Sequence, residues 1–188
     1  MPEFVGVGYA RCYPDGRYMK DQIPIIDKEK GFIDITNAER KKYHLDMDMV
    51  EAYRLSYLKK YPFPVWENEF FAPEQIVFNQ MALDGLKVRW RDEKLYICEY
   101  LPNGMTKDDK IVKKNPMGYA MMYNQNILFS KSFSEKVKNV LQMSALSMYG
   151  KNPGYIRKSN AKGLAVCLLP ASFALFLRRK RQYKKLGD

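Results

Sequence analysis

Cysteine and histidine are scarce in this sequence of 188 residues, and neither is arranged for cross-linking or metal binding. The three cysteines, Cys12, Cys98 and Cys167, are far apart and form no Cys-x-x-Cys pair, and the single histidine, His44, has no cysteine beside it. An odd number of scattered cysteines argues against a disulfide framework or a zinc site. We therefore expect a reduced, cytoplasmic protein.

Phosphate-binding, triad and targeting motifs are missing as well. The sequence contains neither G-x-x-x-x-G-K-[ST] nor G-x-G-x-x-G, and one histidine gives no convincing Ser-His-acid triad. The first residues include an acid and no apolar run, so we expect no signal peptide. The C-terminal stretch 164–177 has fourteen residues without a charge, whereas a membrane-spanning helix needs about 20 apolar residues.

Positive charge is abundant and unevenly distributed. The net charge is +11, and six of the eight residues in 178–185 are lysine or arginine. Without residues 178–188 the net charge would be +6, so much of the excess belongs to a tail, which argues against nucleic-acid binding. The composition, with 46% apolar and 28% charged residues, is that of one folded domain with or without a tail.

Local patterns predict a mixture of strands and helices. Strands are expected at 3–13, 87–90 and 94–100, and a strand or a short turn at 47–54. Turns are expected at 14–16 and 102–104. Helices are expected at 38–42, with Asn37 as the cap, at 55–60 and at 73–86, followed by one or two methionine-rich helices in 116–149. We expect the methionines of the last region to form core. Pro73 and Glu74 suit the first turn of their helix, and Asp84-Gly85 suits its end.

The end of the chain changes abruptly from apolar to basic at Arg178. Pro170 near the middle of the uncharged stretch and the basic residues after it fit a helix on the membrane surface, or a shallow re-entrant helix, held by anionic lipid. The alternative is a buried terminal helix with a solvated basic end.

Two acidic segments are candidates for chemistry. Asp46-Met47-Asp48 has the spacing of a divalent-metal motif, but the same spacing is common in exposed acidic loops. Residues 66–80 hold three carboxylates and several aromatic side chains ahead of a helix start. A carboxylate there can act as a general base and the aromatics can stack on a sugar, or the segment is a capped helix with an apolar approach loop.

An ordered series of motifs resembles the bacterial family-2 glycosyltransferases, which build polysaccharides and cell-envelope glycans. The series is YPDG (13–16), ER-K-Y (39–43), VEAYR (50–54), LKKYPFP (58–64), ENEFFAPEQIVFNQMALDG (67–85), LYICEYLPNGMT (95–106) and KKNPMGYAMMYN (113–124). The resemblance covers residues 4–125 and corresponds to the second, acceptor-side half of the family's catalytic domain. It implies an α/β fold, a partial GT-A (Rossmann-like) mixed sheet with flanking helices.

The resemblance also implies a division of the chain. Residues 1–125 would be the C-terminal half of the GT-A-like domain, 126–163 a helical extension, and 164–188 a hydrophobic and basic membrane-associating tail of amphipathic helices. A divalent metal, Mn or Mg, is expected for the family, with its ligands in an N-terminal half ahead of this sequence. Asp46 and Asp48 come too late in the motif order to take that metal role.

Site residues follow from the matching positions. Glu74 matches the family's general base, and Gln80 stands where arginine is usual. Trp66, Glu69 and Phe70 are expected to contact the acceptor. The implied reaction is inverting transfer from a nucleotide-sugar, a UDP-sugar, to a glycan or lipid-linked acceptor, at the cytoplasmic face of the cell membrane.

Two other functions are open from the residues alone. One is a membrane-surface binding protein without enzymatic activity, which would use the aromatic and basic surface. The other is a nucleic-acid-binding protein, for which the affinity would fall steeply with salt and survive deletion of 178–188.

Overall fold

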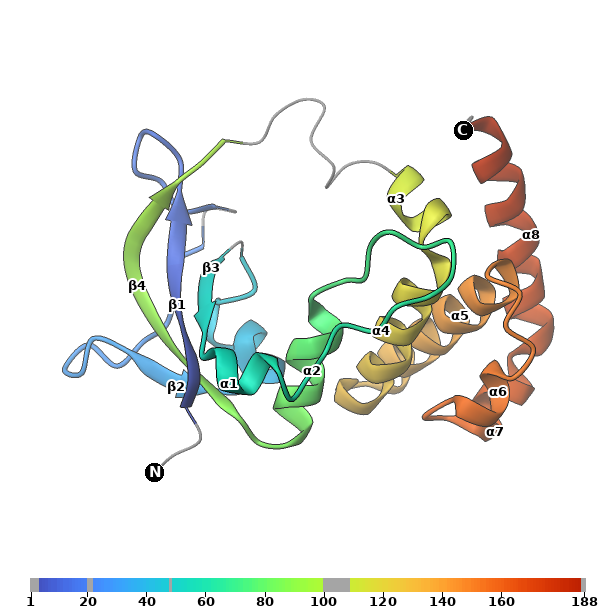
Figure 1. Ribbon diagram of the computed structural model, residues 1–188, viewed down its shortest axis with the longest axis horizontal. Coiled ribbons are helices and arrows are strands. Elements are labelled where there is room, and N and C mark those ends of the chain that lie inside the picture. The colour runs from blue at the N-terminus through green and yellow to red at the C-terminus, as the bar shows by residue number, and fades with distance from the viewer. Residues whose placement is uncertain (1–3, 20–21, 48, 100–108, 187–188) are drawn as a thin grey trace. The chain divides into compact units, whose positions relative to one another are not determined.

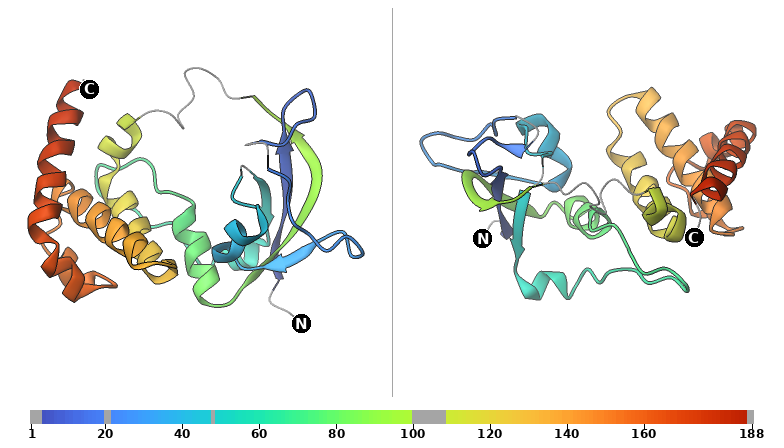
Figure 2. Two further views of the ribbon diagram at one scale, coloured as in Figure 1. Left: turned by 180° about the vertical axis from the view of Figure 1, so that it is seen from behind. Right: turned by 90° about the horizontal axis from the view of Figure 1, so that it is seen from above.

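The structure, a computed structural model, describes residues 4–19, 22–47, 49–99 and 109–186. The chain divides into two compact units. The sheet unit comprises residues 1–62 and 77–102, and the helical unit comprises 63–76 and 103–188. Figures 1 and 2 show strands gathered in the first unit and helices in the second, which confirms a mixed α/β protein.

The sheet unit is built on four strands in the order β2-β4-β1-β3. Its central strands β1 and β4 run parallel, and β3 and β2 pair antiparallel on either side. The elements in chain order are β1 (Phe4–Cys12), β2 (Ile33–Ile35), the 3-10 helix η2 (Asn37–Tyr43), β3 (Met49–Tyr53), α1 (Leu55–Leu58), most of α2 (Gln75–Leu83) and β4 (Lys87–Ile97).

Strand β1 lies between β4 and β3, and it contains two glycines, Gly6 and Gly8. Gly8 lies opposite Trp90 of β4, and a Cβ added at Gly8 would lie 2.3 Å from a ring carbon of that tryptophan. The missing side chain therefore makes room for Trp90, which is completely buried. Val5 and Val77 complete the centre of this core, the second from helix α2.

A buried arginine joins the segments beside the sheet. Arg40 of η2 forms an ion pair with Glu51 of β3, with 3.1 Å between nitrogen and oxygen, and its guanidinium lies 4.5 Å from the centre of the Trp90 ring. Its remaining nitrogens donate to the carbonyl oxygens of Leu45 (2.7 Å) and Met47 (3.1 Å). Every side of this cation is therefore occupied, as a mostly buried charge requires.

Several boundaries differ from those predicted. The regions 87–90 and 94–100, expected as two strands, form the single strand β4 as far as Ile97, with a shift of register against β1 beyond Gly8. The short helix expected at 38–42 is a 3-10 helix that begins at Asn37, and the capping residue is Thr36. Residues 102–104, expected as a turn, lie outside the described residues.

Helix α2 begins two residues later than predicted. Its first residue is Gln75, although the carbonyl of Pro73 already accepts a hydrogen bond from the amide of Ile76 (3.0 Å). It ends at Leu83 and is followed by a left-handed Gly85 (φ 72°). The amide of Leu86 donates to the carbonyl of Met81, as in a glycine C-cap.

The helical unit holds α3 (Asp109–Lys114), α4 (Pro116–Phe129), α5 (Phe133–Tyr149), α6 (Tyr155–Lys158), α7 (Lys162–Cys167) and α8 (Leu169–Lys185). Residues 116–149 form two helices, one of the two alternatives expected. The second helix, α5, has its own N-cap, in which Ser132 accepts a hydrogen bond from the amide of Glu135 (3.1 Å). The core contains Ile127, Val140 and Met143, so at least this methionine is core as predicted.

The uncharged stretch 164–177 is divided between α7 and α8. Pro170 lies in the first turn of α8, where a proline is compatible with a helix. Ser172 and Tyr183 are the buried residues of α8 and lie on one side of it. Arg179 donates to the side-chain oxygen of Gln142 on α5. Within the described part of the chain, no helix is long and apolar enough to cross a membrane.

Candidate functional site

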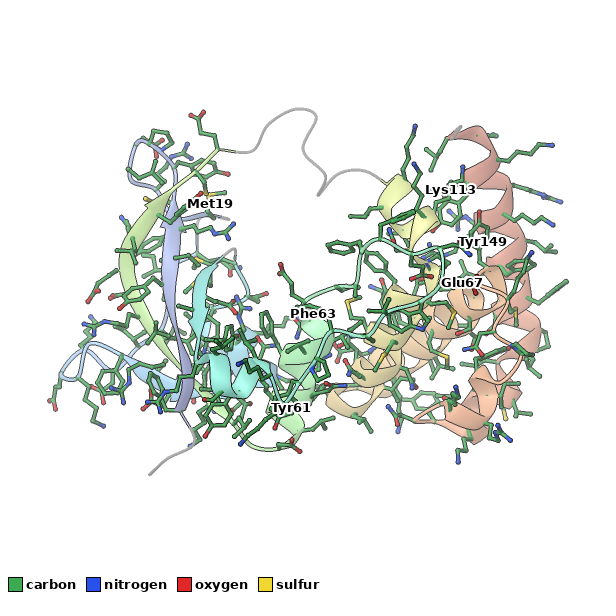
Figure 3. All side chains as sticks on the ribbon, viewed as in Figure 1. Met19, Tyr61, Phe63, Glu67, Lys113 and Tyr149 are labelled. Carbon is green, nitrogen blue, oxygen red and sulfur yellow. The ribbon has the colours of Figure 1, made fainter. Side chains whose placement is uncertain are left out.

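The segment 63–74, which we call the aromatic-acidic segment, has a defined shape without regular secondary structure. It contains a tight turn in which the amide of Glu69 donates to the carbonyl of Trp66 (3.2 Å). Asn68, the third residue of this turn, has a φ of 63°, a conformation that asparagine tolerates better than most residues. Figure 3 labels Phe63 and Glu67 of this segment.

Glu69 fastens the segment to the start of α4. Its carboxylate accepts hydrogen bonds from the amides of Met117 (2.6 Å) and Gly118 (3.0 Å), which are otherwise unsatisfied at a helix N-terminus. A carboxylate there also interacts favourably with the helix dipole. Gly118 allows the close approach, since a Cβ at that position would lie 3.1 Å from Pro73 and 3.2 Å from the carbonyl of Phe71.

Asn115 holds the same segment from the other side. Its side-chain oxygen accepts from the amides of Phe70 (2.7 Å) and Phe71 (2.8 Å), and its side-chain nitrogen donates to the carbonyl of Ile111 (2.8 Å). Asn115 is only 3% exposed, so these bonds are shielded from water. The Phe71 ring also packs against Tyr119, with 6.2 Å between ring centres.

This double attachment leaves part of the segment open to solvent. Phe70 is 90% exposed although its backbone is fixed, and Glu67 and Glu74 are exposed carboxylates. Glu74 immediately precedes the first residue of α2, and no partner contacts its carboxylate among the described residues. The arrangement combines a rigid backbone with freely accessible aromatic and acidic side chains.

Trp66 is half-buried and lines a cavity of about 330 Å³ within the helical unit. The apolar wall is formed by side chains of α4, α5 and α6: Met117, Ala120, Met121, Met143 and Tyr155. Polar groups at the same cavity come from Asn124, Ser147, Asn152 and Lys158. Cavities that combine an aromatic wall with a few polar groups are typical of small-ligand sites.

One polar residue of the cavity, Asn124, is held in place by the end of α6 and the loop after it. The side chain of Asn124 donates to the carbonyl of Lys158 (3.0 Å) and accepts from the amide of Asn160 (2.8 Å). Burial raises the pKa of the Tyr155 phenol above its ordinary value, so this group stays neutral. The exposed Lys158 supplies the positive charge at the cavity.

The four site residues predicted from the sequence share the helical unit but differ in their surroundings. Trp66 lines the cavity, Phe70 and Glu74 face solvent, and Glu69 is engaged by the helix α4. Glu69 therefore has a structural role whether or not it contacts an acceptor. Their predicted roles in acceptor binding and catalysis stay predictions.

The acidic motif at 46–48 is only partly described. Asp46 is exposed, Met47 is buried in the sheet unit, and Asp48 lies outside the described residues. Among the residues that the structure describes, no three His, Cys, Asp or Glu side chains are grouped so that they could hold a metal ion. The metal expected from the family resemblance stays a prediction.

Sequence reasoning missed Asn115 and the polar side of the cavity. The dipeptide Asn115-Pro116 was a usable signal, because asparagine before a proline favours a helix start. Asn124 and Lys158 gave no such signal, because they meet at the cavity only after α4 and α6 pack together.

Comparison with protein-family models, with curated proteins and with solved structures finds no match. A function for this chain must therefore be argued from the site and from the order of its motifs.

Proposed function

We propose that the chain is the acceptor-side part of an inverting glycosyltransferase of GT-A type, acting in polysaccharide or cell-envelope synthesis. The donor would be a UDP-sugar and the acceptor a glycan or a lipid-linked glycan at the cytoplasmic face of the membrane. The observation that carries the proposal is the aromatic-acidic segment, in which a clamped backbone presents Phe70 and Glu74 to solvent and Trp66 to a cavity. The motif order over 4–125 supports the same function.

Glu74 is the general base in this proposal. Its carboxylate takes the proton of an acceptor hydroxyl while the hydroxyl oxygen bonds to the anomeric carbon of the donor. The bond between that carbon and the diphosphate oxygen breaks, the nucleoside diphosphate leaves, and the configuration at the carbon is inverted. An exposed carboxylate without a competing partner is suited to this role, because an acceptor hydroxyl can reach it directly.

Aromatic side chains would hold the acceptor sugar. The faces of sugar rings are apolar enough to pack against aromatic rings, and Trp66 and Phe70 lie on the same clamped segment. Glu69 and Asn115 act as positioning residues, since they fix the backbone between the two rings. The Mn or Mg ion expected for the family would balance the charge of the leaving diphosphate.

The test uses the full chain reconstituted with a donor-binding half, with glycan acceptors and UDP-hexoses in the presence of manganese. Sugar transfer is followed by mass spectrometry, and acceptor binding is followed separately by saturation-transfer NMR. We expect Glu74→Gln to abolish transfer and leave acceptor binding intact, whereas Trp66→Ala should weaken acceptor binding. Glu67→Gln is the matched control, because it removes a second exposed carboxylate of the same segment.

Acceptor binding is measurable even where donor binding requires residues beyond this chain. The proposal fails if no saccharide binds in a Trp66-dependent way, or if transfer is unaffected by Glu74→Gln. A binding protein without enzymatic activity is the second hypothesis, favoured by exposed apolar and basic side chains on α8. That hypothesis predicts no transfer by any variant.

A further inference from the structure

The solvent side of α8 is divided along the helix axis. At 100° per residue, exposed residues on the side away from the buried Ser172 and Tyr183 form one stripe, with Phe173 at its edge, which we call the outer face. All of its residues are exposed: Pro170, Phe173, Ala174, Leu177, Arg178, Arg181, Lys184 and Lys185. Its first half is apolar and its second half is basic.

The apolar half carries large exposed side chains. Phe173 is 52% exposed and Leu177 is 39% exposed, and Val166 at the end of α7 is 51% exposed. The Phe173 ring also contacts Phe176, with 5.8 Å between ring centres. Exposed apolar groups of this size that gather at one helix end are typical of a contact surface.

The basic half lies in a region without negative charge. From Lys136 to Gly187 the sequence has twelve lysine and arginine residues and no aspartate or glutamate. Arg179 turns inward to Gln142 on α5, whereas Arg178, Arg181 and Lys185 point along the outer face and form no ion pair with the described residues. The charge of this face therefore favours an anionic partner.

We propose that α8 docks the helical unit onto an anionic lipid bilayer in a tilted orientation. Phe173 and Leu177 would enter the boundary between headgroups and acyl chains, and the side chains of 178–185 would lie among the lipid phosphates. The centres of the two halves are about 12 Å apart along the axis at 1.5 Å per residue, which suits a tilt better than a flat position. The inference does not require that the chain transfers sugar.

A lipid surface fits better than a nucleic acid because of the apolar half. Nucleic-acid backbones need positive charge and hydrogen bonds, and they offer nothing to exposed Leu177 and Val166. A bilayer supplies an apolar layer next to a layer of negative charge. The apolar half of the outer face matches the first layer, and its basic half matches the second.

The first experiment is vesicle flotation of the full chain with phosphatidylcholine alone and with added phosphatidylglycerol. We expect binding only with the anionic lipid. Arg181→Glu combined with Lys185→Glu should weaken it by more than about tenfold, since each basic residue near the surface contributes about a factor of five. Lys41→Glu combined with Lys59→Glu, two exposed lysines of the sheet unit, makes the same change in net charge and should have little effect.

The apolar half is tested with Phe173→Ser combined with Leu177→Ser. This pair should reduce binding at constant charge, while Leu55→Ser, at a site that is 64% exposed in the sheet unit, should not. Circular dichroism of each variant checks that the helices are retained. Equal binding to neutral and anionic vesicles, or equal losses in variants and controls, would overturn the proposal.

The tilt needs a measurement of depth. In a background with Cys98→Ser and Cys167→Ser, a fluorescent probe is attached at Ala174→Cys or at Lys184→Cys, and brominated acyl chains are used as quenchers. We expect strong quenching at position 174 and weak quenching at 184. Equal quenching would overturn the tilt, and displacement of the chain from vesicles by an equal phosphate concentration of DNA would assign the surface to nucleic acid.

Discussion

The two units of this chain use charge in opposite ways. The sheet unit has 15 lysine and arginine residues against 14 aspartate and glutamate residues, and the helical unit has 17 against 7. In the sheet unit, two arginines are neutralised by ion pairs: Arg40 pairs with Glu51, and Arg89 pairs with Asp34. The net charge of +11 is therefore almost entirely a property of the helical unit.

Amide side chains join several parts of the helical unit. Asn115 clamps the aromatic-acidic segment, Gln125 donates to the carbonyl of Ile76 (3.1 Å), and Asn124 holds the loop after α6. Uncharged groups serve this purpose at a lower desolvation cost than ions. The positive side chains are then left on the surface, where they can act on a partner.

The largest effect is expected in the sheet unit, from Arg40→Ala. The change leaves Glu51 charged, mostly buried and without its ion pair, and it removes the cation from the Trp90 ring. Loss of one partner of a buried pair costs about 3–5 kcal/mol. Urea titration measures the free energy of unfolding of each variant. The exposed pair of Arg91 and Glu93 provides the control, because Arg91→Ala should lower that free energy by less than about 1 kcal/mol.

The second effect is expected in the helical unit, from Asn115→Ala. The change leaves the amides of Phe70 and Phe71 without their acceptor in a buried place, at a cost of about 2–3 kcal/mol. Hydrogen exchange at residues 63–74 should accelerate, while exchange in β1 and β4 should stay unchanged. Asn115→Asp keeps an acceptor oxygen, so protection of the two amides should partly return; acceleration equal to that of the alanine variant would contradict the clamp.

A third prediction concerns salt. Like charges three and four residues apart on α8, such as Arg181 and Lys185, cost about 0.2–0.5 kcal/mol per pair, and salt screens that repulsion. Moderate salt should therefore slow hydrogen exchange in α8 and leave exchange in β1 unchanged. An equal response of both units would remove the contrast between them.

The smallest effect is a pH dependence in the sheet unit. The hydrogen bond from the Tyr61 phenol to the Asp84 carboxylate (2.6 Å) raises the pKa of Tyr61 to about 12. Because this pKa is above the ordinary value of 10, the stability that the bond provides is complete below pH 10 and is lost as the pH rises to about 12. Tyr61→Phe should remove this component, which is less than about 1 kcal/mol because the pair is solvent-exposed. Denaturant titrations of both proteins at several pH values give the comparison.

Local signals predicted much of the fold. Strand-like residues predicted β1, and a strand was one of the two alternatives for the region of β3. Gly85, whose φ is 72°, marked the end of α2. The continuity of β4 was missed because the charged residues 91–94 do not have a strand-like pattern. They belong to the strand because its pairing with β1 continues beyond Gly8 after a shift of register. Pairing between distant strands has no local signature in either one.

The candidate site was predicted only in part for a similar reason. The sequence pointed to residues 66–80, because carboxylates and aromatics gather there before a helix. It could not indicate that Glu69 is bound by α4, since its partners Met117 and Gly118 are 48 and 49 residues further along the chain. A carboxylate ahead of one helix thus caps another helix.

That separation has a consequence for synthesis of the chain. The aromatic-acidic segment leaves the ribosome well before Asn115 and the start of α4, and the second part of the sheet unit, 77–102, is made in between. The helical unit therefore cannot complete its fold until the sheet unit has been fully synthesised. A chain that is cut near residue 102 would carry the segment on one fragment and its anchor on the other. The first fragment would hold the whole sheet unit, and only the helical unit would be divided.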